Sequence, residues 1–567
     1  MNIESFIWKV CDDVLRDDFK RHEYGDIILP FLVLRRLDCV QEEHKDEIVN
    51  LYGELKDKFD DPSDIIHTKL NINFSNHSRY DLRRLVNEPS KLNENLLEYL
   101  RSFSPNIQDI IVNFKLDSWI EELEKNDSLY QLIEKFSEVD LHPSKVDNHL
   151  MGSIFEELLR QFSEMSNETS GEHYTPRDIV NLLVSLVFSP ETEELSKPNK
   201  IVSLYDPCCG TGGMLTIGKE WIKDKISKTI EVNMFGQEKN GQTYSICKSD
   251  FLITGEQPEN IKRWSTLSKD GFQDTNRKFD YMLCNPPYGV SWKKEEEFVK
   301  NESTDPTGRF SIGTPRISDG QLLFLQHMIS KMEPTGSRIG VIFNGSPLFT
   351  GDSGGGECEI RKWIIENDWL ETIVQLPDSM FFNTGIATYL WIVTNKKYSK
   401  RKGKIQLIDG SKKFKVMKKS LGKKRKKISR DGAEEILNSY LNFQENEISK
   451  IYENSYFGYT KVQVEQPLVK DGEIIKLKSG KPKPNSKLRD HDRIPLNDSI
   501  DEYFDREIKP HQPNSWIDRS KDKIGYEINF RKQFYIFEPL RQSSEIIKDI
   551  LDIEKDSEKL SRDITNE

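Results

Sequence analysis

From Lys200 onward, short apolar segments alternate with stretches of helical character, and no other pattern in the sequence restricts the possible folds as strongly. The clearest apolar segments are 201–205, 232–235, 281–283, 339–343, 373–376 and 389–393. Strands that alternate with helices form mostly parallel sheets with helices on both faces. We therefore expect an α/β fold with a mostly parallel, doubly wound sheet. Ligands of such sheets bind beyond the carboxyl ends of the strands, and functional residues are sought there.

The sequence predicts three parts, because 567 residues are too many for one hydrophobic core. Residues 1–145 are expected to form an all-helical domain and residues 146–400 the domain with the sheet. Residues 401–567 are more charged and are expected to end in a helix. Apolar residues of that helix fall on the a and d positions of a heptad pattern, which suits packing on its own chain or on a partner helix: Ile546, Ile550, Ile553, Leu560 and Ile564.

Charge is distributed unevenly along the chain. The net charge is −12, which is unusual for a chain that binds a polyanion by itself. Between Lys412 and Arg430, however, eleven residues are Lys or Arg and none is acidic. Such a run is either a solvated surface segment or a contact for a polyanion. An acidic chain can also rely on a basic partner.

Cysteine usage and hydropathy exclude several classes of protein. The seven cysteines include no Cys-x-x-Cys pair, so we predict reduced, mainly buried thiols and no metal site. No run of about 18 apolar residues could span a membrane. The first residues lack the layout of a signal peptide, and we expect the chain to stay in the cytoplasm.

The first candidate site is the segment Asp206-Pro207-Cys208-Cys209-Gly210-Thr211-Gly212-Gly213, which follows an apolar segment directly. Its glycines allow a tight turn and a close approach of a ligand to the backbone. No Gly-Lys-Ser/Thr follows, which excludes a phosphate-binding loop. Asp206 suits a cationic ligand, and Glu238, at the end of the next predicted strand, is placed to hold ribose hydroxyls. Each acid alone is compatible with helix capping, but together they favour an adenosyl cofactor.

The second candidate site is Asn285-Pro286-Pro287-Tyr288, again at a predicted strand end. Two prolines usually mark only a stiff loop. Here a rigid loop is useful, because the amino nitrogen of adenine is a poor nucleophile and acceptors held in fixed positions can activate it. The Asn285 side-chain oxygen and the Pro286 carbonyl can each accept one of its N–H groups and draw the nitrogen toward tetrahedral geometry. Tyr288 offers a flat surface on which a flipped-out base can stack.

With these two motifs the chain resembles the modification subunits of type I restriction–modification systems, a family of amino-methyltransferases. The resemblance covers most of the chain. It includes the helical N-terminal region and the segments 171–177, 319–327, 336–341, 376–377, 381–386 and 524–530. One position departs from the pattern: many relatives carry Gly-Asp before Thr-Leu, where this chain has Trp264-Ser265.

The resemblance implies transfer of a methyl group from S-adenosylmethionine to the N6 nitrogen of adenine in DNA. It implies a catalytic set of Asn285, Pro286, Pro287 and Tyr288. It also implies a cofactor-binding set of His173, Tyr174, Thr175, Pro176, Asp206, Cys208, Gly210, Thr211, Gly212, Gly213, Glu238 and Ser265. His173 has no partner spaced for a metal site or a catalytic triad. His327, Phe324 and Phe349 are predicted to be structural or core residues.

The implied partners are double-stranded DNA, a specificity subunit that reads the DNA sequence, and a second copy of this chain. A translocating nuclease subunit can join them. This sequence shows no nuclease or ATPase site, so cleavage of DNA would need such a further chain. Three other functions fit the motifs: N5-methylation of a glutamine side chain, a non-catalytic assembly subunit, and a methyltransferase of another phage-defence system. The basic run and the large helical N-terminal region favour DNA as the substrate.

Overall fold

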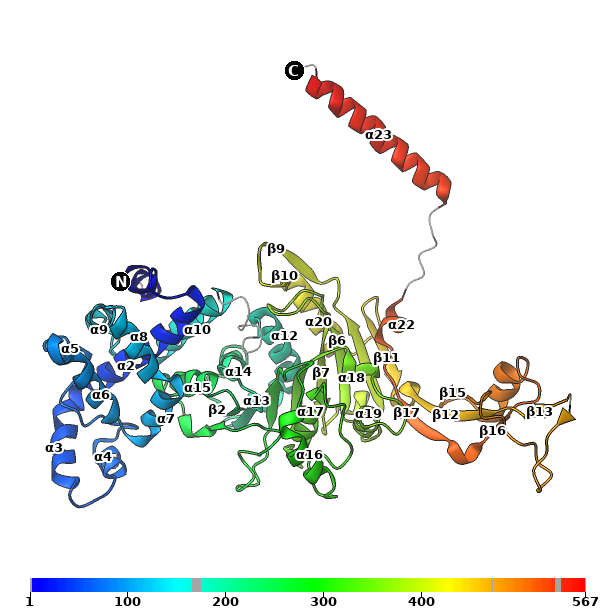
Figure 1. The fold of residues 1–567 in the computed structure, drawn as a ribbon, viewed down its shortest axis with the longest axis horizontal. Helices are drawn as coiled ribbons and strands as arrows, with labels where there is room; N and C mark the ends of the chain where they lie inside the picture. The colour runs from blue at the N-terminus through cyan, green and yellow to red at the C-terminus, as the bar shows by residue number, and fades with distance from the viewer. Residues whose placement is uncertain (1–2, 166–174, 472, 536–541, 566–567) are drawn as a thin grey trace. The chain divides into compact units, whose positions relative to one another are not determined.

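The computed structural model describes residues 3–165, 175–471, 473–535 and 542–565 (Figure 1). The chain divides into two compact units, Met1–Ile528 and Asn529–Glu567. Among the residues described, no helix is both long and apolar enough to cross a membrane.

A nine-stranded sheet forms the centre of the first unit. Its strands are β1 (Ile201–Asp206), β2 (Glu231–Glu238), β3 (Ile261–Arg263), β4 (Tyr281–Cys284), β5 (Arg338–Asn344), β6 (Leu370–Gln375), β7 (Thr388–Thr394), β8 (Lys404–Asp409) and β11 (Ser449–Glu453). Their order is β11-β8-β6-β7-β5-β4-β1-β2-β3. Strands β3, β2, β1, β4 and β5 are parallel, whereas β7 runs antiparallel to both β5 and β6. The predicted α/β sheet and all six predicted strands are confirmed.

Helices cover both faces of this sheet (Figure 1). On one face lie α12 (Arg177–Phe188), α14 (Gly213–Lys225), α15 (Gly241–Ile253) and α20 (Arg430–Asn442), whose apolar residues share a core with Val202 and Leu204 of β1. The other face carries α17 (Gln321–Ser330) and α19 (Gly356–Glu366). Because side chains alternate along a strand, Tyr205 points to this second face, where its hydroxyl meets Nε2 of the buried His327 at 2.9 Å.

The N-terminal region is helical, as predicted. Its helices are α1 (Ile3–Val10), α2 (Tyr24–Gln41), α3 (Lys45–Leu55), α4 (Ser63–Leu70), α5 (Leu82–Leu85), α6 (Leu92–Arg101), α7 (Pro105–Phe114), α8 (Leu116–Lys125), α9 (Leu129–Glu138) and α10 (Asn148–Met165). Their core also takes in Ile246, Leu252 and Ile253 of α15. Asp109 of α7 binds both the Tyr244 hydroxyl at 2.6 Å and the Lys248 ammonium at 2.8 Å. These contacts join the helical region to the sheet through α15.

Beyond residue 400 the chain first extends the sheet, with β8 and β11. Between these two strands, the basic run forms an antiparallel hairpin of β9 (Phe414–Leu421) and β10 (Lys424–Ile428). A second, smaller sheet follows, which the sequence did not lead us to expect: β12 (Gly458–Glu465), β15 (Asp490–Pro495), β16 (Trp516–Ile517) and β17 (Lys523–Tyr526). The short hairpin of β13 (Val469–Lys470) and β14 (Glu473–Ile474) is exposed.

The second unit, taken by itself, contains α22 (Phe530–Phe534) and the long helix α23 (Ser543–Thr565), so the predicted helical C-terminal tail is confirmed. Five apolar side chains of α23 are between 44% and 69% exposed: Ile546, Ile547, Ile550, Leu551 and Ile553. They include the first three residues of the heptad pattern. The domain boundaries expected at 145 and 400 stay predictions.

Candidate active site

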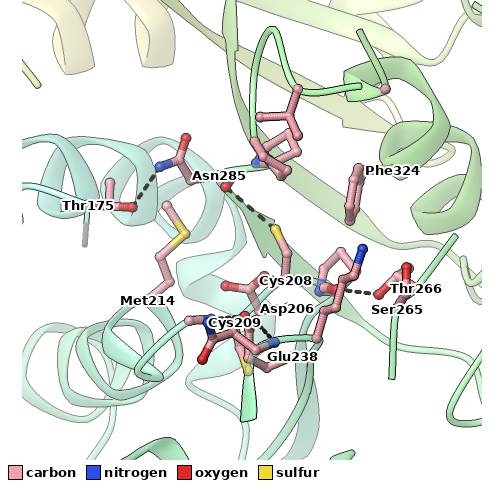
Figure 2. A pocket seen from close by; sticks show the side chains of 18 of the residues that line it. Thr175, Asp206, Cys208, Cys209, Met214, Glu238, Ser265, Thr266, Asn285 and Phe324 are labelled. Carbon is pink, nitrogen blue, oxygen red and sulfur yellow. Dashed lines mark hydrogen bonds between the residues drawn. The ribbon is translucent and has the colours of Figure 1, made fainter. Parts of the chain in front are cut away.

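A cavity of about 520 Å³ opens at the carboxyl ends of β1 and β4, where the order of the strands reverses. This is the place at which α/β sheets bind ligands, and its volume lies within the range of about 300–1,000 Å³ for small-molecule sites. Twelve of the predicted site residues line it: Thr175, Asp206, Cys208, Gly210, Thr211, Gly213, Glu238, Ser265, Asn285, Pro286, Pro287 and Tyr288. The fold therefore brings the two candidate motifs to one cavity (Figure 2).

The other predicted site residues do not line the cavity or are not described. Pro176 is buried and precedes the first residue of α12. Gly212 is the residue that precedes α14 and is not among the residues that line the cavity. His173 and Tyr174 lie outside the described residues.

The glycine loop depends on two backbone conformations that favour glycine. Gly210 has a φ of 55° and Gly212 a φ of 89°. A Cβ atom on Gly212 would lie 2.9 Å from Sγ of Cys247, closer than real Cβ contacts. The loop thereby turns tightly from β1 into α14, and the first N–H groups of that helix have no side-chain cap. Such free N–H groups are available to a polar ligand.

Glu238 holds the glycine loop from the neighbouring strand. Its two carboxylate oxygens accept hydrogen bonds from the N–H groups of Gly210, at 3.0 Å, and Asn240, at 2.7 Å. Each oxygen retains a second acceptor position. The carboxylate is fixed at the cavity wall and can accept bonds from hydroxyl groups of a ligand.

Asp206 lies deeper, with 2% of its surface exposed. Burial raises the pKa of its carboxyl group to about 8, although the N–H of Cys208, which binds it at 3.0 Å, acts in the opposite direction. The carboxyl group therefore keeps its proton to a higher pH than an ordinary aspartate does. A positively charged ligand favours the carboxylate form, because it offsets the cost of burying the charge.

Asn285 carries a buried polar atom in the cavity wall that has no partner in the described structure. Its Nδ2 donates a hydrogen bond to Oγ1 of Thr175 at 2.9 Å, which fixes the side chain (Figure 2). Its Oδ1 is buried and has no hydrogen-bond partner in the structure. Leaving a buried acceptor unpaired costs about 1–3 kcal/mol. An orphaned oxygen at a cavity wall therefore indicates a ligand that donates a hydrogen bond to it.

An aromatic surface lies next to this oxygen. The Tyr288 ring is half-buried and meets Phe381 edge to face, with ring centroids 6.1 Å apart. Asn383, two residues further on, also lines the cavity and also has a buried Oδ1 without a partner. The loop 376–387 therefore brings a second acceptor into the cavity. Residues 381–386 of this loop carry part of the family resemblance, but no motif in them predicted a site residue.

Glu295 is a further cavity residue that the sequence analysis missed. It is buried, and its Oε1 accepts a hydrogen bond from the Ser265 hydroxyl at 3.2 Å and pairs with the Lys239 ammonium. It supplies a carboxylate beside the position where relatives carry an acid and this chain carries Ser265. Trp264 lines the same wall, with the Lys269 ammonium 3.9 Å from its ring centroid. No motif pointed to Glu295, because it lies outside both motifs, in the helical turn Lys293–Glu295 that follows the second motif.

The thiols near the cavity are protonated. Sγ of Cys208 and Sγ of Cys284 are 3.3 Å apart, and Asp206 completes a group of three potential metal ligands. Burial raises the pKa of Cys284 to about 11, and the pKa of Cys208 is raised well above its ordinary value by the Cys284 thiol and by burial. A structural zinc site needs four ligands, and its cysteines bind the metal as thiolates. The absence of a metal site stays a prediction.

Two predictions for aromatic residues had different outcomes. Phe324 belongs to a small buried cluster with Trp292 and Leu323, as expected, but it also lines the cavity. Phe349 is 56% exposed, so its assignment to the core was wrong. The periodicity of α18 (Ser346–Phe349) could not reveal this, because the helix is a single turn.

Comparison with known proteins gives consistent matches along the chain. Residues 146–465 match the N-6 DNA methylase family, and residues 3–136 match the HsdM N-terminal domain. The methylase subunit of the type I restriction enzyme MjaIX from Methanocaldococcus jannaschii is 26% identical over 83% of this chain and 82% of its own length. The EcoEI methylase subunit from Escherichia coli is 31% identical over 48% of this chain and 51% of its own length.

Solved structures support the fold. The methyltransferase subunit of a type I restriction–modification system from Streptococcus thermophilus superposes with a TM-score of 0.62 at 22% identity, over 80% of this chain and 95% of that one. A chain from a structure of a type I restriction–modification system, described for its complex assembly, gives a TM-score of 0.57 at 22% identity. The match covers 99% of this chain and 98% of that chain. At these identities the likeness establishes a shared architecture.

Proposed function

The chain belongs to the N-6 DNA methylase family, and from this premise we propose that its cavity at the ends of β1 and β4 is where it methylates the N6 nitrogen of adenine in DNA. The enzyme is an S-adenosylmethionine-dependent DNA methyltransferase. The observation that carries the assignment of the site is the orphaned Oδ1 of Asn285. It lies in the same cavity as the glycine loop, because the loop follows β1, Asn285 follows β4, and these two strands are neighbours in the sheet.

The cofactor half of the cavity comprises the glycine loop, Asp206, Glu238 and the wall with Glu295. Bound there, S-adenosylmethionine supplies a methyl carbon attached to a positively charged sulfur. Glu238, fixed by two backbone N–H groups, accepts bonds from the ribose hydroxyls. Asp206 offers a carboxylate to the positive charge of the ligand. Ser265, held by Glu295, takes the position of the acid found in relatives.

The substrate half comprises Asn285, Pro286, Pro287 and Tyr288. Oδ1 of Asn285 accepts one N–H of the adenine amino group, and the Pro286 carbonyl accepts the other. Both bonds draw the lone pair out of conjugation with the ring, so the nitrogen can attack the methyl carbon without a strong base. The N–C bond forms as the S–C bond breaks, and one proton then leaves the nitrogen for solvent. Tyr288 stacks on the flipped base.

We also propose the assembly that the family resemblance implies. Two copies of this chain flank a specificity subunit on double-stranded DNA, and a restriction subunit can join them. The exposed apolar side chains of α23 support a docking role for this helix, since contiguous exposed apolar surface marks sites of protein interaction. Delegating base recognition to a partner also fits a chain with a net charge of −12.

Glutamine N5-methylation and a non-catalytic role are the alternatives to exclude. The test is to incubate the chain with labelled S-adenosylmethionine and duplex DNA, with and without the specificity subunit. We expect label in DNA, dependent on the specificity subunit. Label found only in protein would support the glutamine reaction. Failure to bind S-adenosylmethionine in a calorimetric titration would support the non-catalytic role.

A further inference from the structure

The basic run forms a structured element, although a charged run in a sequence usually indicates only a solvated segment. Strands β9 and β10 pair in an antiparallel hairpin, with Phe414 opposite Ile428 and Lys415 opposite Lys427. An isolated two-stranded hairpin is marginally stable in water. Contacts with the rest of the chain must therefore hold it in place.

Lys424 is the main anchor of this hairpin. It is buried, and its ammonium binds the Asp178 carboxylate at 3.1 Å and the Met380 carbonyl at 2.9 Å. The same carboxylate accepts the N–H of Ile428 at 2.9 Å. Lys426 pairs with Asp378 at 3.0 Å. One face of the hairpin is thus fixed to the body of the protein.

The opposite face carries positive charge that the protein does not neutralise. Lys415 and Lys427 lie on this face as cross-strand partners, and Lys419 follows in the part of β9 where the register shifts; all three are exposed. None of the three contacts an acidic side chain in the described part of the chain. Lys415 and Lys427 are direct cross-strand partners, and like charges at such positions destabilise a sheet. A ligand with several negative charges would remove this repulsion.

The hairpin is also attached to the wall of the active-site cavity. The N–H of Lys423 donates to the Phe382 carbonyl at 2.8 Å, and the next residue, Asn383, lines the cavity. Phe381 packs on Tyr288. The anchor Asp178 follows Thr175, which binds Asn285, on the same short stretch of chain. The charged face is therefore tied to the residues proposed to receive the target base.

We propose that the exposed lysine face of the β9–β10 hairpin binds the phosphate backbone of the DNA that carries the target adenine. This inference rests on the proposed function, because it assumes that DNA reaches the cavity. Eight residues of β9 extend about 27 Å, less than one turn of B-DNA at about 34 Å, so the face can follow one side of the duplex. Lysines on such a face bind phosphates without reading sequence.

The test uses the chain in complex with its specificity subunit and a triple variant, K415Q/K419Q/K427Q. Methyl transfer to duplex DNA is measured at several salt concentrations. We expect the KM for DNA to rise roughly tenfold, while kcat at saturating DNA and the Kd of S-adenosylmethionine stay unchanged. Each lost phosphate contact reduces the slope of log KM against log salt by about 0.9, so the slope should fall by about 2.7.

Two further variants act as controls. K415R/K419R/K427R keeps the charge and should behave like the wild type. K476Q/K478Q/K481Q removes the same charge from another exposed segment and should leave the salt slope unchanged. An unaltered KM and slope in the glutamine hairpin variant would overturn the proposal, as would an equal change in the second control. Loss of co-purification with the specificity subunit would instead indicate an acidic protein surface as the partner. A wild-type complex that transfers no label to DNA refutes the proposed function itself.

Discussion

Replacing Asn285 with alanine removes the acceptor on which the proposed chemistry depends. The variant loses the Nδ2–Thr175 bond of 2.9 Å and the unpartnered Oδ1. The first loss costs about 1 kcal/mol of folding free energy, and removal of a buried, unpaired acceptor offsets part of it. The protein should therefore remain folded, and its cofactor loop is untouched.

The effect on the reaction should be much larger than the effect on stability. Removing one preorganised polar group from the site where charge develops typically lowers kcat by about 10²–10³, equivalent to about 2.7–4 kcal/mol. We expect Asn285→Ala to reduce the single-turnover rate by this factor while the Kd of S-adenosylmethionine changes less than about threefold. The rate is measured by rapid-quench transfer of labelled methyl groups to duplex DNA, and the Kd by calorimetry.

Asn301→Ala, an exposed substitution in α16 (Glu296–Ser303), is the matched control. It should leave both quantities unchanged. A single-turnover rate of Asn285→Ala within about threefold of the wild type would refute the reasoning from the orphaned oxygen. A parallel loss of cofactor binding would show that Asn285 supports the cofactor loop and not the base.

Three other predictions concern the cofactor half of the cavity. The affinity for S-adenosylmethionine should increase as the pH rises toward about 8, by up to about tenfold per unit, and then level off, because the raised pKa of Asp206 means that a proton must leave before the carboxylate can meet a cation. Calorimetry at several pH values measures this. Glu295→Gln should raise the Kd roughly tenfold in the same assay, with kcat retained, because Ser265 loses a charged partner. Gly212→Ala should lower the free energy of unfolding in urea by about 1–3 kcal/mol, since its φ of 89° and the nearby Cys247 sulfur both oppose a side chain.

Each of these predictions has a result that contradicts it. An affinity that does not change with pH, or a pH dependence that persists in Asp206→Asn, would rule out Asp206 as the titrating group. A Glu295→Gln enzyme with normal cofactor affinity would show that this carboxylate does not contribute to cofactor binding. Gly213→Ala is the control for the loop, because a Cβ atom there meets nothing within 4 Å. If it destabilises the protein as much as Gly212→Ala, the steric argument fails.

The sequence predicts the sheet well because its signal is local. Each of the six expected strands is a short apolar segment, and each becomes a strand buried between two layers of helices. The three strands that were missed lack this signal. β3 has three residues, β11 lies at the edge of the sheet, where polar residues are tolerated, and in β8 the buried polar residue Gln406 interrupts the apolar segment. The small sheet after residue 457 was missed for a related reason, since its buried core is limited to a few residues such as Val462 and Ile494.

The two motifs of the site were also predictable, because each stands directly at a strand end. The two motifs meet in one cavity because β1 pairs with β4. In α/β sheets, ligand sites are expected at the carboxyl ends of the strands where the strand order reverses. Glu295 and Asn383 could not be found in this way. They enter the cavity from a helical turn after the second motif and from the loop 376–387, and neither segment carries a motif that points to the site. The same holds for the hairpin: its charge was visible in the sequence, but its attachment to the cavity wall through Asp178 was not.

The central claim is that this chain methylates the amino nitrogen of adenine in DNA. The most direct measurement is to let the complex of this chain and its specificity subunit transfer labelled methyl groups to duplex DNA, digest the DNA to nucleosides, and identify the labelled species by mass spectrometry. We expect all label to be in N6-methyldeoxyadenosine and its rate of formation to fall by about 10²–10³ with Asn285→Ala. Label in a methylated cytosine, or in protein with none in DNA, would contradict it.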